Sequence, residues 1–324
     1  MSSAFELWRA LTNGDRRALS KAITLVESSL PSDREQAREL LSCAGGPSLG
    51  SFRVGVTGVP GAGKSTLLDA LGLQATAAGR RVAVLAVDPS SRQSGGSVLG
   101  DKTRMTRLAR EPSAFVRPSP TLGVLGGTAG RTREVIALCE AAGYDVLFVE
   151  TVGVGQSEEE VASMVDCVLL VLLAGAGDEL SSMKRGILEA TDVIAFNKAD
   201  GERRPLVENE AASLSASLSI SRGDRVPPVL TVSALEETGM AALWSSVWQV
   251  RTRAEQDGSF ATRRAAQRRA WFEAAVEEAF RSALSSPDLA RSREEAALSV
   301  EGGACSPGVA AESWVLQLLG PSKH

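Results

Sequence analysis

The sequence predicts an α/β protein with a mostly parallel central sheet and helices on both faces of that sheet. Short apolar runs alternate with helical stretches, and near-continuous Val, Ile and Leu runs are typical of strands buried on both sides. These runs are "RVGVTG", "RVAVLAVD", "DVLFVET", "CVLLVLLAG", "DVIAFNKAD" and "PVLTVSA". Strand signals stop after about residue 257, so we expect three parts: a helical extension over 1–48, a nucleotide-binding domain over 49–257 and a helical arm over 258–324.

The N-terminal part is predicted to be helical. Leu19, Ile23 and Val26 recur at helical spacing, and "PSDREQARELL" opens with a proline and an aspartate, which favour a helix start. The turn residues of "SCAGGPSLGS" then end the segment. We therefore expect an N-terminal helical extension ahead of the sheet.

The C-terminal part contains an amphipathic helix with an aromatic stripe. Phe272, Val276, Phe280 and Leu284 recur every four residues. This stripe could pack within its own chain or against a second subunit. The arginine pairs of the same helix are typical of a solvated face rather than of a nucleic-acid contact.

Composition argues against several classes of protein. A net charge of −4 does not favour an electrostatic grip on nucleic acid. No run approaches the ~18 to 20 apolar residues of a membrane span, and the first residues resemble neither an export nor a transit signal. We expect a cytoplasmic protein that binds neither nucleic acid nor membrane.

Cysteine and histidine usage narrows the chemistry further. The four cysteines are scattered without CxxC spacing, which favours a reducing cytosol and no structural zinc. The only histidine is His324, the last residue, so histidine-based acid/base chemistry and histidine metal ligands are not expected. Chemistry then has to depend on carboxylates, lysines, hydroxyls and backbone amides.

The strand "RVGVTG" leads into "GVPGAGKST", which matches the G-x-x-x-x-G-K-[ST] phosphate loop. Its glycines let successive N–H groups turn toward an anion, and the following helix adds its positive N-terminus. Lys64 is expected to reach the β and γ phosphates, and Ser65 to supply a hydroxyl to Mg²⁺. A glycine-rich turn without a ligand is the alternative, but strand, spacing, Lys-Ser pair and helix coincide here. The predicted nucleotide-binding residues of this loop are Gly58, Val59, Pro60, Gly61, Ala62, Gly63, Lys64, Ser65 and Thr66.

The motif "NKAD" directly after the strand "DVIAF" predicts selection of guanine. The Asp200 carboxylate can accept from guanine N1–H and N2–H₂, whereas adenine would leave that charge unpaired. The stem of Lys198 can lie over the purine ring, and Asn197 can brace the loop. A turn with an ordinary aspartate cap is the alternative. The loop after the next strand offers a backbone amide to guanine O6, and its residues are Ser233, Ala234 and Leu235.

The stretch "FVETVGVGQSE" ends an apolar strand in Glu150 and continues into a glycine-rich loop. This strand should lie near the phosphate loop, so Glu150 is expected to face Mg²⁺ directly or through water. The Gly153 amide could meet the γ-phosphate. Small GTPases carry a glutamine that orients water where this chain has Val154. We therefore predict slow intrinsic hydrolysis that a partner accelerates.

Two more acids are candidates for the magnesium shell or its waters. Asp88 ends a strand, and Asp101 lies in the glycine-rich stretch "SGGSVLGDKTRM". This stretch could become ordered only when a γ-phosphate is present. For Asp88 the alternative is a simple turn, because proline and serine follow it.

These motifs together resemble the MeaB/MMAA/ArgK family of GTPases, which are G-protein chaperones of adenosylcobalamin-dependent acyl-CoA mutases. The resemblance covers roughly residues 15 to 240. Its strings include "ALSKAITLVES", "GVTGVPGAGKST", "VLAVDPSS", "SGGSVLGDKTRM", "CEAAGYDVLFVETVGVGQSE", "AGAGDELSSMKRGI" and "NKAD". The pair "ETVGVGQSE" and "SGGSVLGDKTRM" is far more specific than the phosphate loop.

The resemblance implies a P-loop NTPase of the SIMIBI type that binds GTP or GDP with Mg²⁺ and forms a homodimer through its C-terminal helical arm. It implies that the protein gates adenosylcobalamin loading into an acyl-CoA mutase, such as methylmalonyl-CoA mutase, and protects that enzyme. By position, Asp88, Asp101 and Glu150 match the magnesium-associated acids of the family. Lys184 matches a lysine in a third switch, which couples nucleotide state to the mutase; without the resemblance it would be an ordinary solvated lysine.

Three functions are therefore weighed. The first is a GTP hydrolase that acts as a conformational timer on a cobalamin-dependent mutase. The second is a kinase that phosphorylates a small molecule or transport component. The third is a structural dimer with permanently bound nucleotide. A kinase needs a substrate pocket with a base near the γ-phosphate, and the sequence offers neither an internal histidine nor a lid-like domain.

Overall fold

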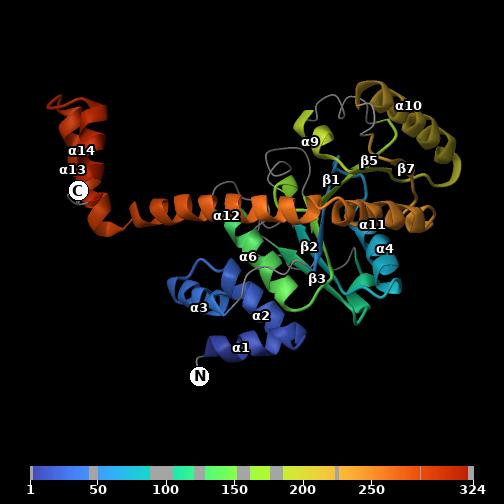
Figure 1. The fold of residues 1–324 in the computed structure, drawn as a ribbon, viewed down its shortest axis with the longest axis horizontal. Coiled ribbons are helices and arrows are strands. Elements are labelled where there is room, and N and C mark those ends of the chain that lie inside the picture. The colour runs from blue at the N-terminus through green and yellow to red at the C-terminus, as the bar shows by residue number, and fades with distance from the viewer. Residues whose placement is uncertain are drawn as a thin grey trace. The chain divides into compact units, whose positions relative to one another are not determined.

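The computed structural model describes residues 3–43, 50–87, 105–119, 128–151, 161–175, 185–222, 226–284 and 286–319. Its centre is a seven-stranded sheet in the order β3-β2-β4-β1-β5-β6-β7, in which every neighbouring pair is parallel (Figure 1). The strands are β1 Phe52–Gly58, β2 Val82–Val87, β3 Ala114–Ser119, β4 Val146–Glu150, β5 Cys167–Leu172, β6 Val193–Phe196 and β7 Val229–Thr231. The predicted parallel α/β sheet is thus confirmed.

One strand has no counterpart among the predicted apolar runs. β3 contains Arg117 and Pro118, so its sequence lacks the continuous apolar character of the other strands. It pairs with β2 alone at the edge of the sheet. Proline is tolerated at such an edge because one side of the strand makes no ladder hydrogen bonds.

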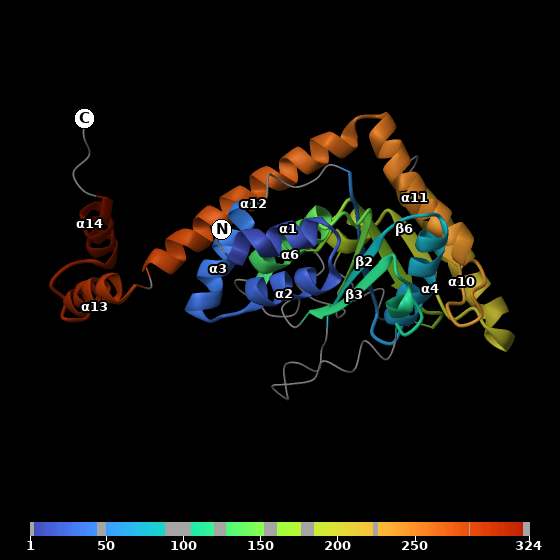
Figure 2. The ribbon, with the colours of Figure 1, turned by 90° about the horizontal axis from the view of Figure 1, so that it is seen from below.

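Helices cover both faces of the sheet, as Figure 2 shows. α4 packs along β1, β2 and β4, and α11 packs against α4, β5 and β6. α6 lies on the opposite face, backed by α2 (Figure 2). The helices of this part are α4 Lys64–Ala77, α6 Thr128–Ala141, α9 Arg185–Ala190, α10 Arg204–Arg222 and α11 Met240–Gln256.

The N-terminal extension consists of α1 Ser3–Thr12, α2 Arg16–Glu27 and α3 Pro31–Ser42, which pack against one another. Asp15 caps α2 by accepting hydrogen bonds from the backbone N–H groups of Arg17 and Ala18. Glu27 joins the extension to the domain, because its carboxylate accepts from Arg117 at 2.8 Å and its carbonyl oxygen from Arg131 at 2.7 Å.

The chain divides into two compact units, Met1–Gln267 and Arg268–His324. α12 Ser259–Leu284 begins in the first unit and ends in the second. The second unit also holds α13 Pro287–Glu301 and α14 Pro307–Leu319, which pack against each other. Phe272 and Phe280 on the aromatic stripe of α12 are exposed.

A buried ionic cluster holds the start of α12, which belongs to the first unit, against the sheet of that unit. Arg264 donates to the Asp166 carboxylate at 2.6 and 2.7 Å, and Arg53 donates to Glu140 at 2.7 and 2.9 Å. Arg264 also reaches Glu140 at 3.2 Å, so the two pairs form one cluster without net charge. All four side chains are at most 2% exposed.

Candidate functional site

The carboxyl ends of all seven strands lie on the same side of the sheet, because every neighbouring pair of strands is parallel. The chain leaves β1 toward β2 on one side and later crosses from β4 to β5 on the other side. The carboxyl end of β1 is therefore the topological switch point, where open α/β sheets bind ligands. The predicted phosphate loop begins at this position.

The loop that follows β1 requires glycine at two places. Gly58 has a φ of +145°, and a Cβ atom there would lie 2.0 Å from the carbonyl oxygen of Val171. Gly63 has a φ of +81°, and a Cβ atom there would lie 2.8 Å from the side-chain nitrogen of Asn197. A side chain at Gly58 would overlap the backbone of β5, and one at Gly63 would displace the Asn197 amide. Both residues also have a positive φ, which favours glycine.

Lys64 and Ser65 begin α4 directly after this loop and are both buried. The ammonium group of Lys64 donates to the carbonyl oxygens of Gly58 at 2.8 Å and of Val59 at 3.2 Å. These two carbonyl oxygens thereby hold the ammonium group of Lys64 against the backbone of the loop. Among the other loop residues, Val59 and Ala62 are buried, whereas Pro60, Gly61 and Thr66 are exposed.

Glu150 lies beside the phosphate loop because β4 pairs with β1, with Glu150 opposite Val56. The hydroxyl of Ser65 donates to the two carboxylate oxygens of Glu150, at 3.1 and 3.4 Å. Carboxylate and hydroxyl oxygens are the hard ligands that Mg²⁺ prefers, and Mg²⁺ keeps several waters. The Ser65 and Glu150 oxygens are therefore of the type that suits a magnesium ion, and their assignment to magnesium stays a prediction.

No group of three or more His, Cys, Asp or Glu side chains in the described ranges could hold an ion. Asp88, Asp101, Gly153 and Lys184, which were also predicted as site residues, lie outside the described residues.

Asn197 joins the phosphate loop to the two loops of the predicted guanine site. Its side-chain nitrogen donates to the carbonyl oxygen of Ala62 at 2.7 Å, and its side-chain oxygen accepts from the Ala234 N–H at 3.1 Å. The side chain is 2% exposed, so both hydrogen bonds are buried. Asn197 follows β6 and Ala234 follows β7, and these strands are neighbours.

Asp200 and Ser233 are also brought together. The hydroxyl of Ser233 donates to Oδ1 of Asp200 and accepts from the Glu236 N–H at 3.0 Å. This hydrogen bond holds Oδ1 of Asp200, and no residue of the described ranges donates to Oδ2, so Oδ2 is available to a ligand. Lys198 has a left-handed φ of 61°, and its side chain passes beside Gly63. Leu235 is 77% exposed.

Two contacts near this edge were not predicted from the sequence. The hydroxyl of Thr151 donates to that of Thr57 at 3.1 Å, which ties the ends of β4 and β1 below the loop. The Gly175 N–H, after β5, donates to both carboxylate oxygens of Glu210 on α10 at 2.9 Å. No sequence motif marks these pairs, because each depends on which strands and helices become neighbours.

The parallel sheet with a phosphate loop after its central strand defines a P-loop NTPase. The sequence model of a family described as "Methylmalonyl Co-A mutase-associated GTPase MeaB" matches residues 19–288. The chain belongs to this MeaB family, as its motifs predicted.

Known relatives agree with this assignment. The chain is 48% identical over 307 residues to a probable GTPase of Mycobacterium tuberculosis, covering 94% of this chain and 91% of that protein. It is 44% identical to "GTPase ArgK" of Escherichia coli, covering 92% of both proteins. It is 42% identical to the mitochondrial "Methylmalonic aciduria type A homolog" of Mus musculus, covering 94% of this chain and 77% of that protein.

A solved structure has the same fold over the whole chain. It is described as "LAO/AO transport system kinase", and it matches with a TM-score of 0.73 and 35% identity, covering 99% of both chains. Among the described residues, none of the helices is both long and apolar enough to cross a bilayer.

Proposed function

We propose that this protein binds GTP and Mg²⁺ at the carboxyl ends of its parallel strands and hydrolyses the nucleotide slowly. The observation that carries this proposal is the position of Asn197, which is bonded to both the phosphate loop and the Ala234 loop. A triphosphate on the first loop and a base against the second would then lie in one continuous site. The relatives named as GTPases support the same activity.

Each residue has a defined part in this proposal. Lys64 would turn its ammonium group from the loop carbonyls to the β and γ phosphates, and the α4 N-terminus would add N–H donors. Ser65 and Glu150 would hold the magnesium ion or its waters. That ion would neutralise charge on the β and γ phosphate oxygens. By the family resemblance, Asp88 and Asp101 would complete its shell and the Gly153 amide would contact the γ-phosphate.

Guanine would be selected by Asp200. Its carboxylate would accept from N1–H and N2–H₂, with Ser233 holding the other side of the group. Lys198 would cover the ring, and the amides of Ala234 or Leu235 would meet O6.

Asp200→Asn tests this assignment, because it should weaken GTP binding and strengthen binding of xanthosine triphosphate. Unchanged GTP affinity in this variant would contradict the base site.

We further propose that the partner is an adenosylcobalamin-dependent acyl-CoA mutase, whose cofactor loading and protection depend on the GTP cycle. The family description, which names methylmalonyl-CoA mutase, supports this choice. Lys184 would couple nucleotide state to that partner. The homodimer through the C-terminal arm, the cytoplasmic location and the three-part division at residues 48 and 257 stay predictions.

The GTPase rate with and without a purified cobalamin-dependent mutase tests the whole proposal. We expect ~10⁻⁴ to 10⁻² s⁻¹ for the protein alone and a clear increase with the mutase. A rate near ~10 s⁻¹ without a partner would contradict it. Lys64→Ala should abolish tight nucleotide binding and serves as the inactive control.

Phosphoryl transfer is the second candidate, because the solved structure with the same fold is described as a kinase. Incubation with γ-labelled GTP and small-molecule acceptors separates the two functions. Label in inorganic phosphate alone supports hydrolysis, whereas label in an acceptor supports a kinase. Nucleotide that neither exchanges nor turns over with mutase present would support a structural dimer instead.

A further inference from the structure

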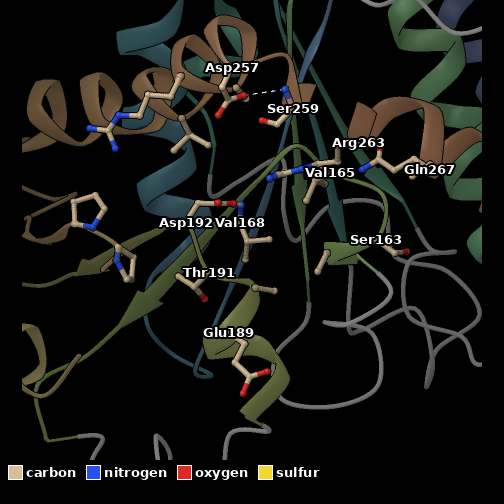
Figure 3. Close-up of a pocket in the computed structure, with 18 of the residues that line it drawn as sticks. Ser163, Val165, Val168, Glu189, Thr191, Asp192, Asp257, Ser259, Arg263 and Gln267 are labelled. Carbon is tan, nitrogen blue, oxygen red and sulfur yellow. Dashed lines mark hydrogen bonds between the residues drawn. The ribbon is translucent and has the colours of Figure 1, made fainter. Parts of the chain in front are cut away.

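A cavity opens at the amino ends of β5, β6 and β7. Its volume is about 900 Å³. Its walls come from the segments before β5 and β7 and from the ends of α9 and α11, with the first turns of α12 (Figure 3). Because the strands are parallel, the phosphate loop lies at their opposite ends. The proposed nucleotide site therefore does not use this cavity.

Most of the cavity wall is apolar. It could therefore cover the hydrocarbon part of a ligand. The apolar side chains are Ala162, Val165, Val168, Ala190, Val226, Pro227, Pro228, Val250, Ala254 and Ala266.

Asp192 places a carboxylate in this wall. Its Oδ2 accepts a hydrogen bond from the Val168 N–H at 2.8 Å, which fixes the group. Burial raises the pKa of Asp192, although the Val168 hydrogen bond and the charge of Arg263 oppose this. No residue in the described ranges donates to its Oδ1. A donor brought by a ligand would satisfy that oxygen.

Arg263 places the opposite charge at the same cavity, and Figure 3 shows its side chain extending toward Asp192. One guanidinium nitrogen donates to the carbonyl oxygen of Asp166. Within the described part of the chain, Arg263 forms no ion pair with Asp192 or with any other acid. The half-buried Asp192 carboxylate and the exposed Arg263 side chain thus both line the cavity, and the Arg263 charge acts on Asp192 without an ion pair between them.

Further polar side chains line the same cavity. The side-chain nitrogen of Gln267 donates to the Val165 carbonyl oxygen at 2.7 Å, while its oxygen is buried without a partner among the described residues. Glu189, Arg253 and Asp257 add charges of both signs on exposed lining positions.

We propose that this cavity binds a small zwitterion with an apolar body, of the kind represented by an aliphatic α-amino acid. Its ammonium group would donate to Asp192 and its carboxylate would accept from Arg263, while its side chain would lie on the Val and Pro wall. A purely apolar ligand would cover both charged groups without adding a hydrogen bond to either. A simple anion would accept from Arg263, but the lining holds three carboxylates against two guanidinium groups.

Ligand analogues that each lack one charge test the proposal. The probes are L-leucine, isoamylamine, which lacks the carboxylate, and isocaproate, which lacks the amine, each titrated calorimetrically into the full chain. We expect L-leucine to bind and each analogue to bind at least about tenfold more weakly, because each loses one charged hydrogen bond. Binding of either analogue as tight as that of L-leucine overturns the proposal. The proposal is also overturned if none of five amino acids binds at millimolar concentration: L-leucine, valine, isoleucine, methionine and phenylalanine.

Two variants locate the site. Asp192→Asn keeps an oxygen for the Val168 N–H but removes the charge, and Arg263→Gln removes the other charge. Each should weaken L-leucine binding by about tenfold or more, whereas Asp33→Asn and Arg203→Gln, the same changes elsewhere, should not. Melting temperatures check folding; if Arg263→Gln is unstable, Asp192→Asn decides alone. Unchanged L-leucine affinity in Asp192→Asn overturns the proposal, and GTP affinity, which should not change, keeps this test separate from the proposed GTPase.

Discussion

The side-chain nitrogen of Asn197 lies 2.7 Å from the carbonyl oxygen of Ala62, so one buried hydrogen bond joins the guanine motif to the phosphate loop. The same side chain accepts from the Ala234 N–H. Asn197 therefore sets the spacing between the parts of the site that would hold a base and its phosphates. This role is structural and does not require direct contact with a ligand.

Asn197→Ala should weaken GTP binding by about tenfold or more, because two buried hydrogen bonds are lost and the loops separate. The measurement is a titration with a fluorescent GTP analogue. Asn209→Ala on the exposed face of α10 is the matched control and should leave the affinity unchanged. Equal affinities of the two variants would contradict the bridging role.

Gly58→Ala should destabilise the first unit by at least about 2 kcal/mol, since its Cβ atom would overlap the Val171 carbonyl oxygen. Gly61→Ala is the matched control, because a Cβ atom there meets nothing within 4 Å. Its positive φ of 76° alone should cost about 1 to 2 kcal/mol. Urea unfolding compares the two, and a larger loss for Gly61→Ala would refute the explanation by close approach.

Arg264→Ala should reduce the free energy of unfolding by about 3 to 5 kcal/mol, because it leaves buried carboxylates without their partner. Arg268→Ala on the same helix is exposed and should change it by less than about 0.5 kcal/mol. Chemical denaturation of both variants measures the difference. Similar values for the two would show that the ionic cluster does not anchor α12.

Acid should destabilise the protein partly through Glu140. Burial by itself would raise the pKa of Glu140, but hydrogen bonds from Arg53 and Ser51 and the charges of Arg53 and Arg264 outweigh it and lower that pKa. Because the pKa of Glu140 is lower in the folded than in the unfolded state, its ionised carboxylate stabilises the fold above about pH 4.3, the pKa of an unfolded glutamate. This stabilisation is lost as the pH falls through the lower folded-state pKa. Glu140→Gln should therefore be less stable than the wild type at about pH 7 and lose less stability in acid. Urea midpoints across this pH range test the sign.

The sequence predicted those features that depend on local pattern. The apolar runs predicted the parallel sheet, and the G-x-x-x-x-G-K-[ST] spacing predicted a loop between β1 and α4. β3 was missed because Arg117 and Pro118 interrupt its apolar character, and only its position at the sheet edge makes that sequence acceptable as a strand.

The sequence by itself determined which chemical groups are available at the candidate site. The reason is that the amino-acid order alone sets the spacing of its lysine, serine, glutamate and aspartate from the apolar strands. Tertiary structure decided which groups meet. The contacts of Ser65 with Glu150 and of Asn197 with Ala62 and Ala234 span many residues and arise only from strand order. The cavity with Asp192 and Arg263 is of the same kind, since it forms only where α12 and the starts of β5 and β6 come together.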